Sequence, residues 1–322
     1  TTYPIAVVTD TENTELSNRF VNFVRFSTTS QAILRAFGFK SLGRNVDKLR
    51  RQRSPLFLLI PGLIALIFLL VPLIALIAQT PWEAFPKIIS SPEALEALRL
   101  SFITSLAATG LAALFGIPMA WLLAREVLPF TGLLRALVIV PLLLPPVVSG
   151  VALLEALGRR GLVGSFLYDN FDITFPFTTV GVVIATTFVA MPFLIITLEG
   201  GFRSLHQRYE DAAATLGASS KRIFFRVSMP MVAPAAIAGL VLCWARALGE
   251  FGATITFAGN FPGVTQTMPL AVYTALESDR SVAIALSLVL LVVSVGVLVA
   301  LLVGLANEGI MKIVANFTAT RG

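Results

Sequence analysis

The stretch LFLLIPGLIALIFLLVPLIALI, residues 56–77, contains no charged side chain. A helix that crosses the hydrocarbon core of a bilayer needs about 20 mostly apolar residues, and this stretch supplies them. Because the run is continuous and does not alternate between polar and apolar residues, it favours a helix over a strand of a membrane barrel. Five further windows meet the same criterion, at residues 100–124, 137–157, 178–198, 231–251 and 282–305. We therefore predict an all-α integral membrane protein with about six transmembrane helices.

The composition of the whole chain agrees with this prediction. Of the 322 residues, 56% are hydrophobic and 13% are charged, whereas soluble domains carry roughly 25% charged residues because water must solvate their surface. Cys243 is the only cysteine and His206 the only histidine. The sequence therefore excludes an internal disulfide and a cysteine-cluster metal site, and it argues against zinc chemistry and Ser-His-Asp catalysis. We expect no catalytic residue and no metal site in this chain.

The positions of the lysines and arginines predict the orientation. With the N-terminus inside, the cytoplasmic segments hold nine before residue 56, two after the second window, five between residues 199 and 230, and two after the last window. The outside loops hold five, and Arg246 lies within a window. This bias places both termini in the cytoplasm of a multi-pass protein of the cell membrane. The net charge of +6 is thus a topology signal, and we expect no nucleic-acid partner.

The same pattern divides the chain into three regions. These are a basic cytoplasmic extension of residues 1–54, a transmembrane domain of residues 55–306, and a short cytoplasmic tail of residues 307–322. Within the extension, scattered apolar residues from Phe20 to Phe39 fit an amphipathic helix on the membrane surface. A mobile tail, anchored by Arg50, Arg51 and Arg53 next to the first span, is the other interpretation.

Prolines interrupt two of the windows. Pro141, Pro145 and Pro146 lie in the third and Pro192 in the fourth. Proline removes a backbone hydrogen bond, and membrane helices tolerate it where neighbouring helices or a cavity compensate. These prolines indicate either a protein-lined pathway or simple structural kinks.

The loop at residues 199–230 reads as helix, tight turn, helix. The segment from Tyr209 to Leu216 is good helix sequence, with acidic residues at its positive N-terminal end. Gly217 fits the left-handed position after a helix. Ser219 or Ser220 can cap a second short helix through Phe225, and Pro230 can open the next span.

Three apolar side chains of this loop have two interpretations. Leu216, Ile223 and Phe224 lie between basic residues, on a side where no other segment of the sequence obviously covers them. An exposed apolar group of this kind usually marks a surface for a partner. The alternative is that the three side chains pack against the membrane domain of the same chain.

The loop carries a longer pattern, Asp211-Ala212-Ala213-x3-Gly217-x9-Val227-x-Met229-Pro230. It resembles the EAA loop of bacterial ABC importer permeases in spacing throughout, with Asp for Glu, Val for Ile and Met for Leu. The resemblance covers residues 56–305 and implies that the loop is a pair of coupling helices that docks in a groove of an ATPase subunit. It assigns this role to Glu210, Asp211, Ala212, Ala213, Leu216, Gly217, Ile223, Phe224 and Pro230.

The partners and cofactors follow from the same resemblance. The sequence contains no Gly-x4-Gly-Lys-Ser/Thr phosphate loop, so ATP and magnesium are expected on a separate ATPase and no cofactor on this chain. The resemblance implies two ATPase copies, an extracytoplasmic oxyanion-binding protein and a second copy of this chain in the bilayer. Closure of the ATPases would move the docked helices, and the spans would follow as rigid bodies.

A second motif bears on the substrate. Residues 249–260, GEFGATITFAGN, followed by residues 265–273, TQTMPLAVY, resemble permeases of the molybdate type. Sulfate and thiosulfate permeases share the Gly-Glu-Phe-Gly start and then diverge, typically without the Thr-Gln-Thr-x-Pro arrangement. The expected substrate is molybdate or tungstate, and sulfate or thiosulfate is the alternative. Molybdate-type systems resemble a homodimer, whereas sulfate systems pair two different permeases.

Candidate pathway residues surround this motif. Arg246 and Glu250 share a helix face, so they form either a structural ion pair or a source of positive potential for an anion. Hydroxyl groups can line a weakly attractive route, or they can bond to the carbonyl four residues earlier in their own helix. The candidates are Arg246, Gly249, Glu250, Phe251, Gly252, Thr254, Thr256, Ser149, Thr186 and Thr187.

An ion-coupled secondary transporter is the alternative from another class. Such a transporter would place unpaired acidic residues at the middle of the membrane. In this sequence Glu155 and Glu250 are the acids within the windows, and each lies near an end or a partner. We therefore favour the ATP-driven importer.

Overall fold

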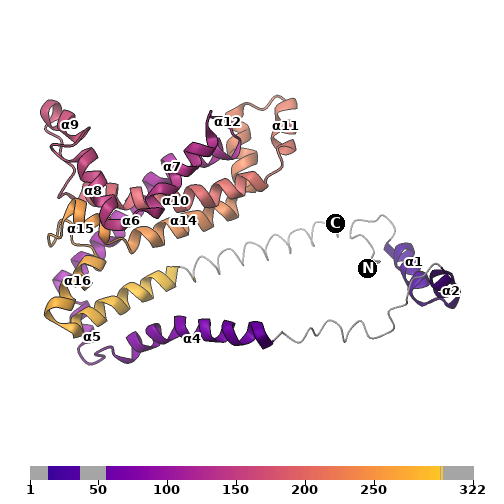
Figure 1. Ribbon diagram of the computed structural model, residues 1–322, viewed down its shortest axis with the longest axis horizontal. Helices are drawn as coiled ribbons and strands as arrows, with labels where there is room; N and C mark the ends of the chain where they lie inside the picture. The colour runs from indigo at the N-terminus through magenta and orange to yellow at the C-terminus, as the bar shows by residue number, and fades with distance from the viewer. Residues whose placement is uncertain (1–13, 37–55, 298, 300–322) are drawn as a thin grey trace, which may run out of the picture. The chain divides into compact units, whose positions relative to one another are not determined.

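The computed structural model describes residues 14–36, 56–297 and 299. Every regular element in these residues is a helix, which confirms the predicted all-α class. The helices, drawn in Figure 1, are α1 (Thr14–Phe26), α2 (Thr28–Ala36), α4 (Leu56–Ala78), α5 (Phe85–Ile89), α6 (Pro92–Ala124), α7 (Thr131–Leu143), α8 (Pro146–Leu157), α9 (Gly164–Phe171), α10 (Thr179–Ser204), α11 (Arg208–Thr215), α12 (Ser220–Ile223), the π-helical turn η1 (Phe224–Ser228), α13 (Met229–Met231), α14 (Ala233–Leu248), α15 (Gly252–Ala258), α16 (Met268–Ser278) and a last helix, Arg280–Val297. The chain divides into two units, residues 1–72 and 73–322.

In the first unit, residues 14–36 form helices α1 and α2, which meet at Ser27. The hydroxyl of Ser30 donates a hydrogen bond of 2.7 Å to the carbonyl oxygen of Phe23 and joins the two helices. The single amphipathic helix expected from Phe20 is thus two helices that begin earlier, at Thr14. This part of the extension is helical and not an irregular tail, while residues 37–39 lie outside the described residues.

Among the described helices, four are long and apolar enough to cross a membrane: α4, α6, α10 and Arg280–Val297. Two bent helix pairs raise the number to six if each pair is counted as one span. The described residues thus contain four to six candidate spans, and each overlaps one of the six predicted windows. Helix α6 begins earlier than its window because the Ser91 side chain accepts a hydrogen bond of 3.2 Å from the N–H of Ala94 and caps a longer helix. The end of the sixth window and the tail at residues 307–322 lie outside the described residues.

The third window is not one continuous span. Helices α7 and α8 meet at an angle of 115° across a short break. Leu144 in that break has an extended backbone with ψ of 135°, because a residue before proline avoids the helical region. Pro145 and Pro146 follow it, whereas Pro141 lies inside α7. Consecutive prolines thus break this span, while the single prolines inside α6 and α10 leave those helices continuous.

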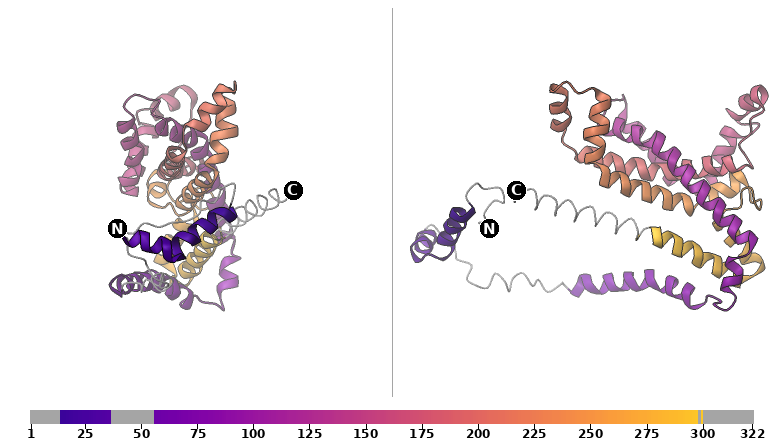
Figure 2. Two further views of the ribbon diagram at one scale, coloured as in Figure 1. Left: turned by 90° about the vertical axis from the view of Figure 1, so that its right-hand side faces the viewer. Right: turned by 180° about the vertical axis from the view of Figure 1, so that it is seen from behind.

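Helix α10 is the centre of the second unit and packs against both α6 and α14 (Figures 1 and 2). One buried cluster joins the three helices through Ala108, Ala112, Ala190, Leu194, Cys243 and Ala247. Small side chains let the backbones approach closely, as is usual for helices in membranes. Gly201 illustrates this closeness, since a Cβ atom there would lie 2.6 Å from the Cβ of Ala235.

The fifth span, α14 (Ala233–Leu248), is shorter than its predicted window, residues 231–251. It was predicted to reach Phe251, but α14 ends at Leu248 and the short helix α15 follows at Gly252. At the other end, Val232 separates α14 from the preceding helical segment, and the two are bent by 77°. Helix α15 packs against α8, and α16 against α6. The hydroxyl of Ser101 accepts a hydrogen bond of 2.7 Å from the N–H of Met268 at the start of α16.

Candidate functional site

The turn between α11 and α12 has the geometry that the sequence predicts. Gly217 has a φ of +81°, a value that glycine adopts without strain. The N–H of Gly217 donates to the carbonyl of Ala214 at 2.9 Å, and the N–H of Ala218 to that of Ala213 at 3.1 Å. This is the hydrogen-bond pattern of a Schellman motif, which closes the end of α11. A Cβ at Gly217 would meet nothing within 4 Å, so the backbone conformation, and not space, requires glycine here.

The second half of the loop differs from the expectation. Ser219 occupies the N-cap position of α12, but its side chain makes no capping hydrogen bond. The helix then continues through η1 and α13, and Pro230 lies in α13, before the bend at Val232 and not at the start of the span. Pro234 instead occupies the first turn of α14. The second half of the loop, Ser220–Met231, and the span α14 thus form one bent pair with an angle of 77° between them.

The apolar side chains of the loop divide between the two interpretations. Leu216 is 88% exposed and Phe225 is 61% exposed. Phe224, in contrast, packs against the rings of Trp121 in α6 and Phe202 in α10, each with ring centroids 6.2 Å apart. Ile223 is half-buried. Leu216 therefore presents an apolar surface, whereas Phe224 attaches the loop to the membrane helices.

The two neighbouring acids of α11 also point to different environments. Glu210 forms a 2.8 Å ion pair with Arg125 and accepts a 2.6 Å hydrogen bond from the hydroxyl of Ser228. Arg125 additionally donates to the carbonyl oxygens of Phe202 and Leu205 at 3.1 and 3.4 Å. One guanidinium thus joins the end of α6 to the end of α10 and to α11, and Glu210 extends the connection to η1. We call this set, Arg125, Glu210, Ser228 and the two carbonyls, the Arg125 clamp.

Asp211, the acid that matches the motif, is exposed together with Ala212, while Ala213 is half-buried. Asp211 has no ion pair with any residue of the described part of the chain. Its carboxylate is therefore available to a partner in solution, in contrast to that of Glu210.

A second group of charges lies at the same end of the spans. Glu199, whose side chain is 7% exposed, pairs with Arg135 of α7 at 2.7 Å and with Arg203 at 3.6 Å. Glu126, in the turn after α6, lies 3.4 Å from Arg203. Glu199 was expected in the loop, but α10 continues to Ser204 and buries it. The prediction that Glu155 and Glu250 are the acids of the spans is therefore wrong, because the candidate span α10 also contains Glu199 and the candidate span α6 contains Glu93 and Glu96.

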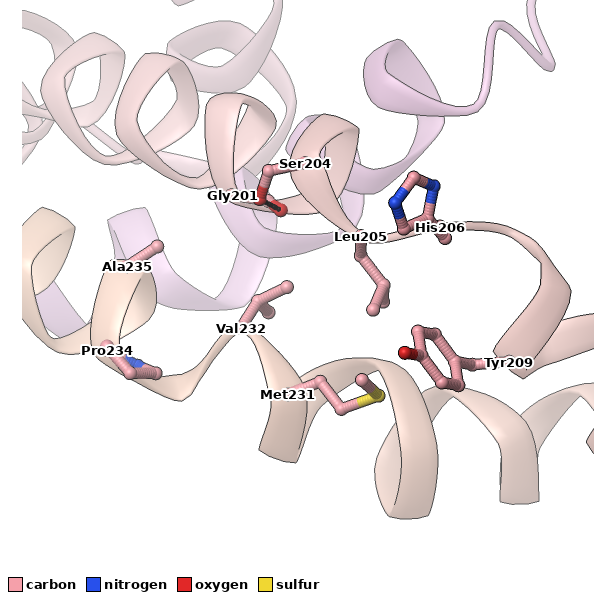
Figure 3. A pocket seen from close by; sticks show the side chains of 9 residues that line it. All are labelled: Gly201, Ser204, Leu205, His206, Tyr209, Met231, Val232, Pro234 and Ala235. Atoms are coloured by element: carbon pink, nitrogen blue, oxygen red, sulfur yellow. Dashed lines mark hydrogen bonds between the residues drawn. The ribbon is translucent and has the colours of Figure 1, made fainter. Parts of the chain in front are cut away.

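An open hollow of about 390 Å³ lies beside the end of α10 and the bend between α13 and α14. Leu205 reaches into it between Val232, Met231 and Tyr209 (Figure 3). His206 lies at the edge of the hollow and is exposed. The loop is thus held to the spans by the Arg125 clamp and the Phe224 ring, and the hollow lies beside these contacts.

The pathway candidates gather elsewhere, where α8, α10 and α15 meet. Arg246 and Glu250 form an ion pair of 2.5 Å, and the Glu250 side chain is 1% exposed. Glu250 also accepts a 2.8 Å hydrogen bond from the N–H of Ala253. The pair therefore holds the Gly249–Phe251 link between α14 and α15, as the structural interpretation predicts. Phe251 itself packs beside Tyr273 with ring centroids 5.2 Å apart.

Two glycines allow α8 and α15 to pack closely against each other. A Cβ at Gly150 would lie 2.5 Å from the Cβ of Thr256, and a Cβ at Gly252 would lie 2.5 Å from that of Pro146. Gly249 ends α14 without such a constraint. Leu153, Ala185, Val189, Ala253 and Phe257 form the buried cluster that brings α10 to the same place.

The hydroxyl candidates fall into two groups. Thr186, Thr187 and Thr256 donate to the carbonyl four residues earlier in their own helices, those of Val182, Val183 and Gly252. Ser149 and Thr254 are 0% and 1% exposed, and their hydroxyl oxygens have no hydrogen-bond partner in the described part of the chain. Back-bonding thus accounts for the first group and leaves Ser149 and Thr254, on the facing helices α8 and α15, as candidates for the route.

Sequence reasoning missed four residues of this site: Arg125, Arg135, Glu199 and Ser228. The two arginines served only as topology signals, and Glu199 was assigned to the loop. Arg125 lies 85 residues from Glu210, and Arg135 lies 64 residues from Glu199. One signal was available, since charges at the edge of a span need partners, but it does not identify the partner.

The sequence matches a model of a known protein family and is similar to several transport permeases. A family model described as "Binding-protein-dependent transport system inner membrane component" matches residues 112–312. The molybdenum transport system permease protein ModB of Mycobacterium tuberculosis is 45% identical over 240 residues, which cover 74% of this chain and 90% of that protein. ModB of Escherichia coli K12 is 44% identical over 180 residues, 55% of this chain and 79% of that protein. The sulfate transport system permease protein CysT of Escherichia coli K12 is 35% identical over 232 residues, 71% and 83% of the two chains.

Solved structures show the same fold. A chain of a bacterial ABC transporter involved in the import of the acidic polysaccharide alginate superposes with a TM-score of 0.61 at 20% identity, over 79% of this chain and 96% of that chain. A chain of the bacterial alginate ABC transporter in complex with an alginate pentasaccharide-bound periplasmic protein superposes with a TM-score of 0.60, also at 20% identity, over 79% and 94%. At this identity the likeness establishes the helical fold alone.

Proposed function

We propose a substrate and a set of partners for this chain from one premise: the chain belongs to the family of binding-protein-dependent transport system inner membrane components. It is a multi-pass membrane protein and a permease subunit of an ABC importer. The proposed substrate is molybdate, or tungstate as its near isostere. The proposed partners are an extracytoplasmic binding protein, two copies of an ATPase subunit that binds ATP and magnesium, and a second copy of this chain.

The observation that carries the substrate proposal is the likeness to the ModB proteins. Identity is 45% with the Mycobacterium tuberculosis protein over 90% of that protein's length, against 35% with the sulfate permease CysT over 83% of its length. The motif at residues 249–273, which resembles that of molybdate-type permeases, supports the same choice. Sulfate or thiosulfate is the alternative that the experiment below tests.

The geometry of the loop supports docking to an ATPase. Leu216, Phe225 and Asp211 are exposed on the α11–η1 segment, and an exposed apolar group with charges beside it is typical of a partner surface. The Arg125 clamp connects this segment to α6 and α10 at the same time. A force applied to α11 would therefore reach two spans together, as rigid-body coupling requires. In this proposal the loop and both termini face the cytoplasm.

The route for the ion is proposed to pass the junction of α8 and α15. Ser149 and Thr254 offer hydroxyl donors without a fixed charge, which suits a site that must release a dianion. An ion-coupled secondary transporter is disfavoured because the buried acids of the described residues, Glu199 and Glu250, are both paired with arginines. No acid of the kind that couples to protons or sodium is left free among them.

The test is an uptake assay in reconstituted vesicles that contain this chain, its ATPase and its binding protein. Labelled molybdate is offered with and without ATP, and then against excess tungstate or excess sulfate. We expect ATP-dependent uptake that tungstate suppresses and sulfate does not. Equal competition by sulfate would overturn the substrate, and uptake without ATP would overturn the importer itself.

A further inference from the structure

The basic residues at the loop end of the second unit fall into two sets. The arginines of α7, α10 and the end of α6 each form an ion pair with a glutamate of this chain. Lys221 and Arg222 of α12 and Arg226 of η1 are exposed and form no ion pair with any residue of the described part of the chain. Arg222 and Arg226 lie four residues apart, a spacing at which like charges on a helix repel each other. The second set is therefore uncompensated by its own chain.

The three cations of the second set share one side of the segment formed by α12 and η1. The exposed residues are 221, 222, 225 and 226, and the half-buried or buried ones are 223, 224, 227 and 228. Residues four apart lie on the same side of a helix. The covered side holds Phe224, which packs on the spans, and Ser228, which belongs to the Arg125 clamp. Lys221, Arg222 and Arg226 therefore lie together on the opposite side, which we call the basic side.

The basic side adjoins the apolar tip of the loop. Helix α11 ends at the 88% exposed Leu216, and the turn at Gly217 connects it to α12, which it contacts. Phe225, 61% exposed, lies on the basic side itself. Asp211 is the one exposed acid of residues 208–228. This surface thus combines apolar groups with an excess of positive charge and one free carboxylate.

We propose that this surface fits an ATPase subunit whose docking groove receives Leu216 and Phe225 and is rimmed by carboxylates that pair with the basic side. The proposal rests on the ATPase docking proposed above and adds the chemistry of the groove. An apolar centre with a polar rim is the usual anatomy of a protein interface. An anionic lipid surface would also attract the basic side, but it would repel the carboxylate of Asp211. A protein groove can complement both signs of charge.

The acidic rim has a consequence for partner choice. Complementary charges at the edge of an interface accelerate association and fix its register, while like charges reject a wrong partner. An ATPase subunit without the carboxylates would leave the three cations unpaired in the complex. The basic side thus selects the ATPase subunit that belongs to this permease, whereas Leu216 supplies the apolar contact.

The experiment measures binding of the purified ATPase subunit to the full chain in nanodiscs of phosphatidylcholine, which carries no net charge. The test pair is Arg222→Gln with Arg226→Gln. The matched control is Arg99→Gln with Arg160→Gln, which removes the same charge from exposed arginines near the start of α6 and after α8. Association and dissociation rates are measured at low and at physiological ionic strength.

In the wild type and the control pair, association should slow by about tenfold from low to physiological ionic strength, because salt screens electrostatic steering. At low ionic strength the test pair should associate about tenfold more slowly than the wild type and lose most of this salt dependence. A wild-type rate and salt dependence in the test pair would overturn the acidic rim. An effect that appears only after phosphatidylglycerol is added to the nanodiscs would also overturn it, because the cations would then bind lipid headgroups.

Leu216→Asp separates the rim from the docking itself. This change should sharply weaken binding whether or not the groove is rimmed by acids. If Leu216→Asp weakens binding while the test pair binds normally, the docking stands and only the rim is overturned. Normal binding in both variants would overturn the docking and, with it, the rim.

A carbodiimide reports the contact directly, since it couples an amine to a carboxylate that touches it. We expect a product that links Lys221 to a carboxylate of the ATPase subunit, identified by mass spectrometry. Lys221→Arg keeps the charge but has no amine to couple, so it should remove this product and bind at the wild-type rate. A wild-type complex in which Lys221 is linked to no ATPase carboxylate would contradict the proposed rim.

Discussion

Two arginine–glutamate pairs, Arg246–Glu250 and Arg125–Glu210, bury their carboxylates in different ways. The first joins residues four apart and holds the turn between α14 and α15. The second joins residues 85 apart and connects three helices and η1. The local pair fixes the shape of one link, while the long-range pair holds three helices and η1 together. The same two residue types therefore stabilise a turn in one region and connect distant elements in the other.

The largest effect is expected where a buried charge loses its partner. Arg246→Leu leaves the Glu250 carboxylate buried without a counter-ion, and the free energy of unfolding should fall by about 3–5 kcal/mol. Thermal unfolding in detergent measures this loss. Arg203→Leu is the matched control, because Arg203 is half-exposed and Glu199 keeps Arg135; it should cost less than about 1 kcal/mol. Equal losses of stability in the two variants would show that Arg246 stabilises the fold no more than Arg203 does.

The long-range pair should affect coupling more than stability. Glu210→Gln keeps the shape of the side chain but removes the charge opposite Arg125, so stability should fall by about 1.5–3 kcal/mol. In the reconstituted importer, we expect more ATP hydrolysed per ion transported, since α11 is then less firmly attached to α6. Asp211→Asn, at the exposed neighbour, should leave stability unchanged. An unaltered ratio of ATP to ion in Glu210→Gln would contradict the role of the Arg125 clamp.

A third variant tests the packing beside the local pair. Gly150→Ala places a Cβ within 2.5 Å of the Cβ of Thr256 and 2.9 Å of the carbonyl oxygen of Ala253. Separating α8 from α15 should cost about 1–3 kcal/mol and lower uptake. Gly110→Ala in α6 is the control, because a Cβ there meets nothing within 4 Å. If Gly150→Ala unfolds no more easily than Gly110→Ala, the close contact of α8 with α15 is not required.

The smallest change in stability is expected at the exposed tip of the loop. Leu216→Asp should alter the free energy of unfolding by less than about 0.5 kcal/mol, because Leu216 is 88% exposed. Binding of the ATPase and ion-stimulated ATP hydrolysis should nevertheless fall sharply. Leu216→Met keeps an apolar tip and should retain both. Normal ATP hydrolysis in Leu216→Asp would mean that the partner does not dock at this side chain.

The sequence by itself determined the features that depend on neighbouring residues. Continuous apolar runs located the six windows. Gly217, which follows the segment of good helix formers from Tyr209 to Leu216, located the turn of the loop. These predictions hold because a span and a Schellman turn are specified by residues within a few positions of each other. The Arg246–Glu250 pair was within reach of sequence reasoning for the same reason, since four residues form about one helical turn.

Only the tertiary structure decided how distant segments face each other. It distinguished Glu210, which is tied to Arg125, from the exposed Asp211 beside it, and Phe224, which packs on Trp121 and Phe202, from the exposed Leu216. It also buried Glu199 inside α10. The arginine partners of Glu210 and Glu199 lie 85 and 64 positions away, and local sequence carries no information about which distant segment will lie beside a given side chain.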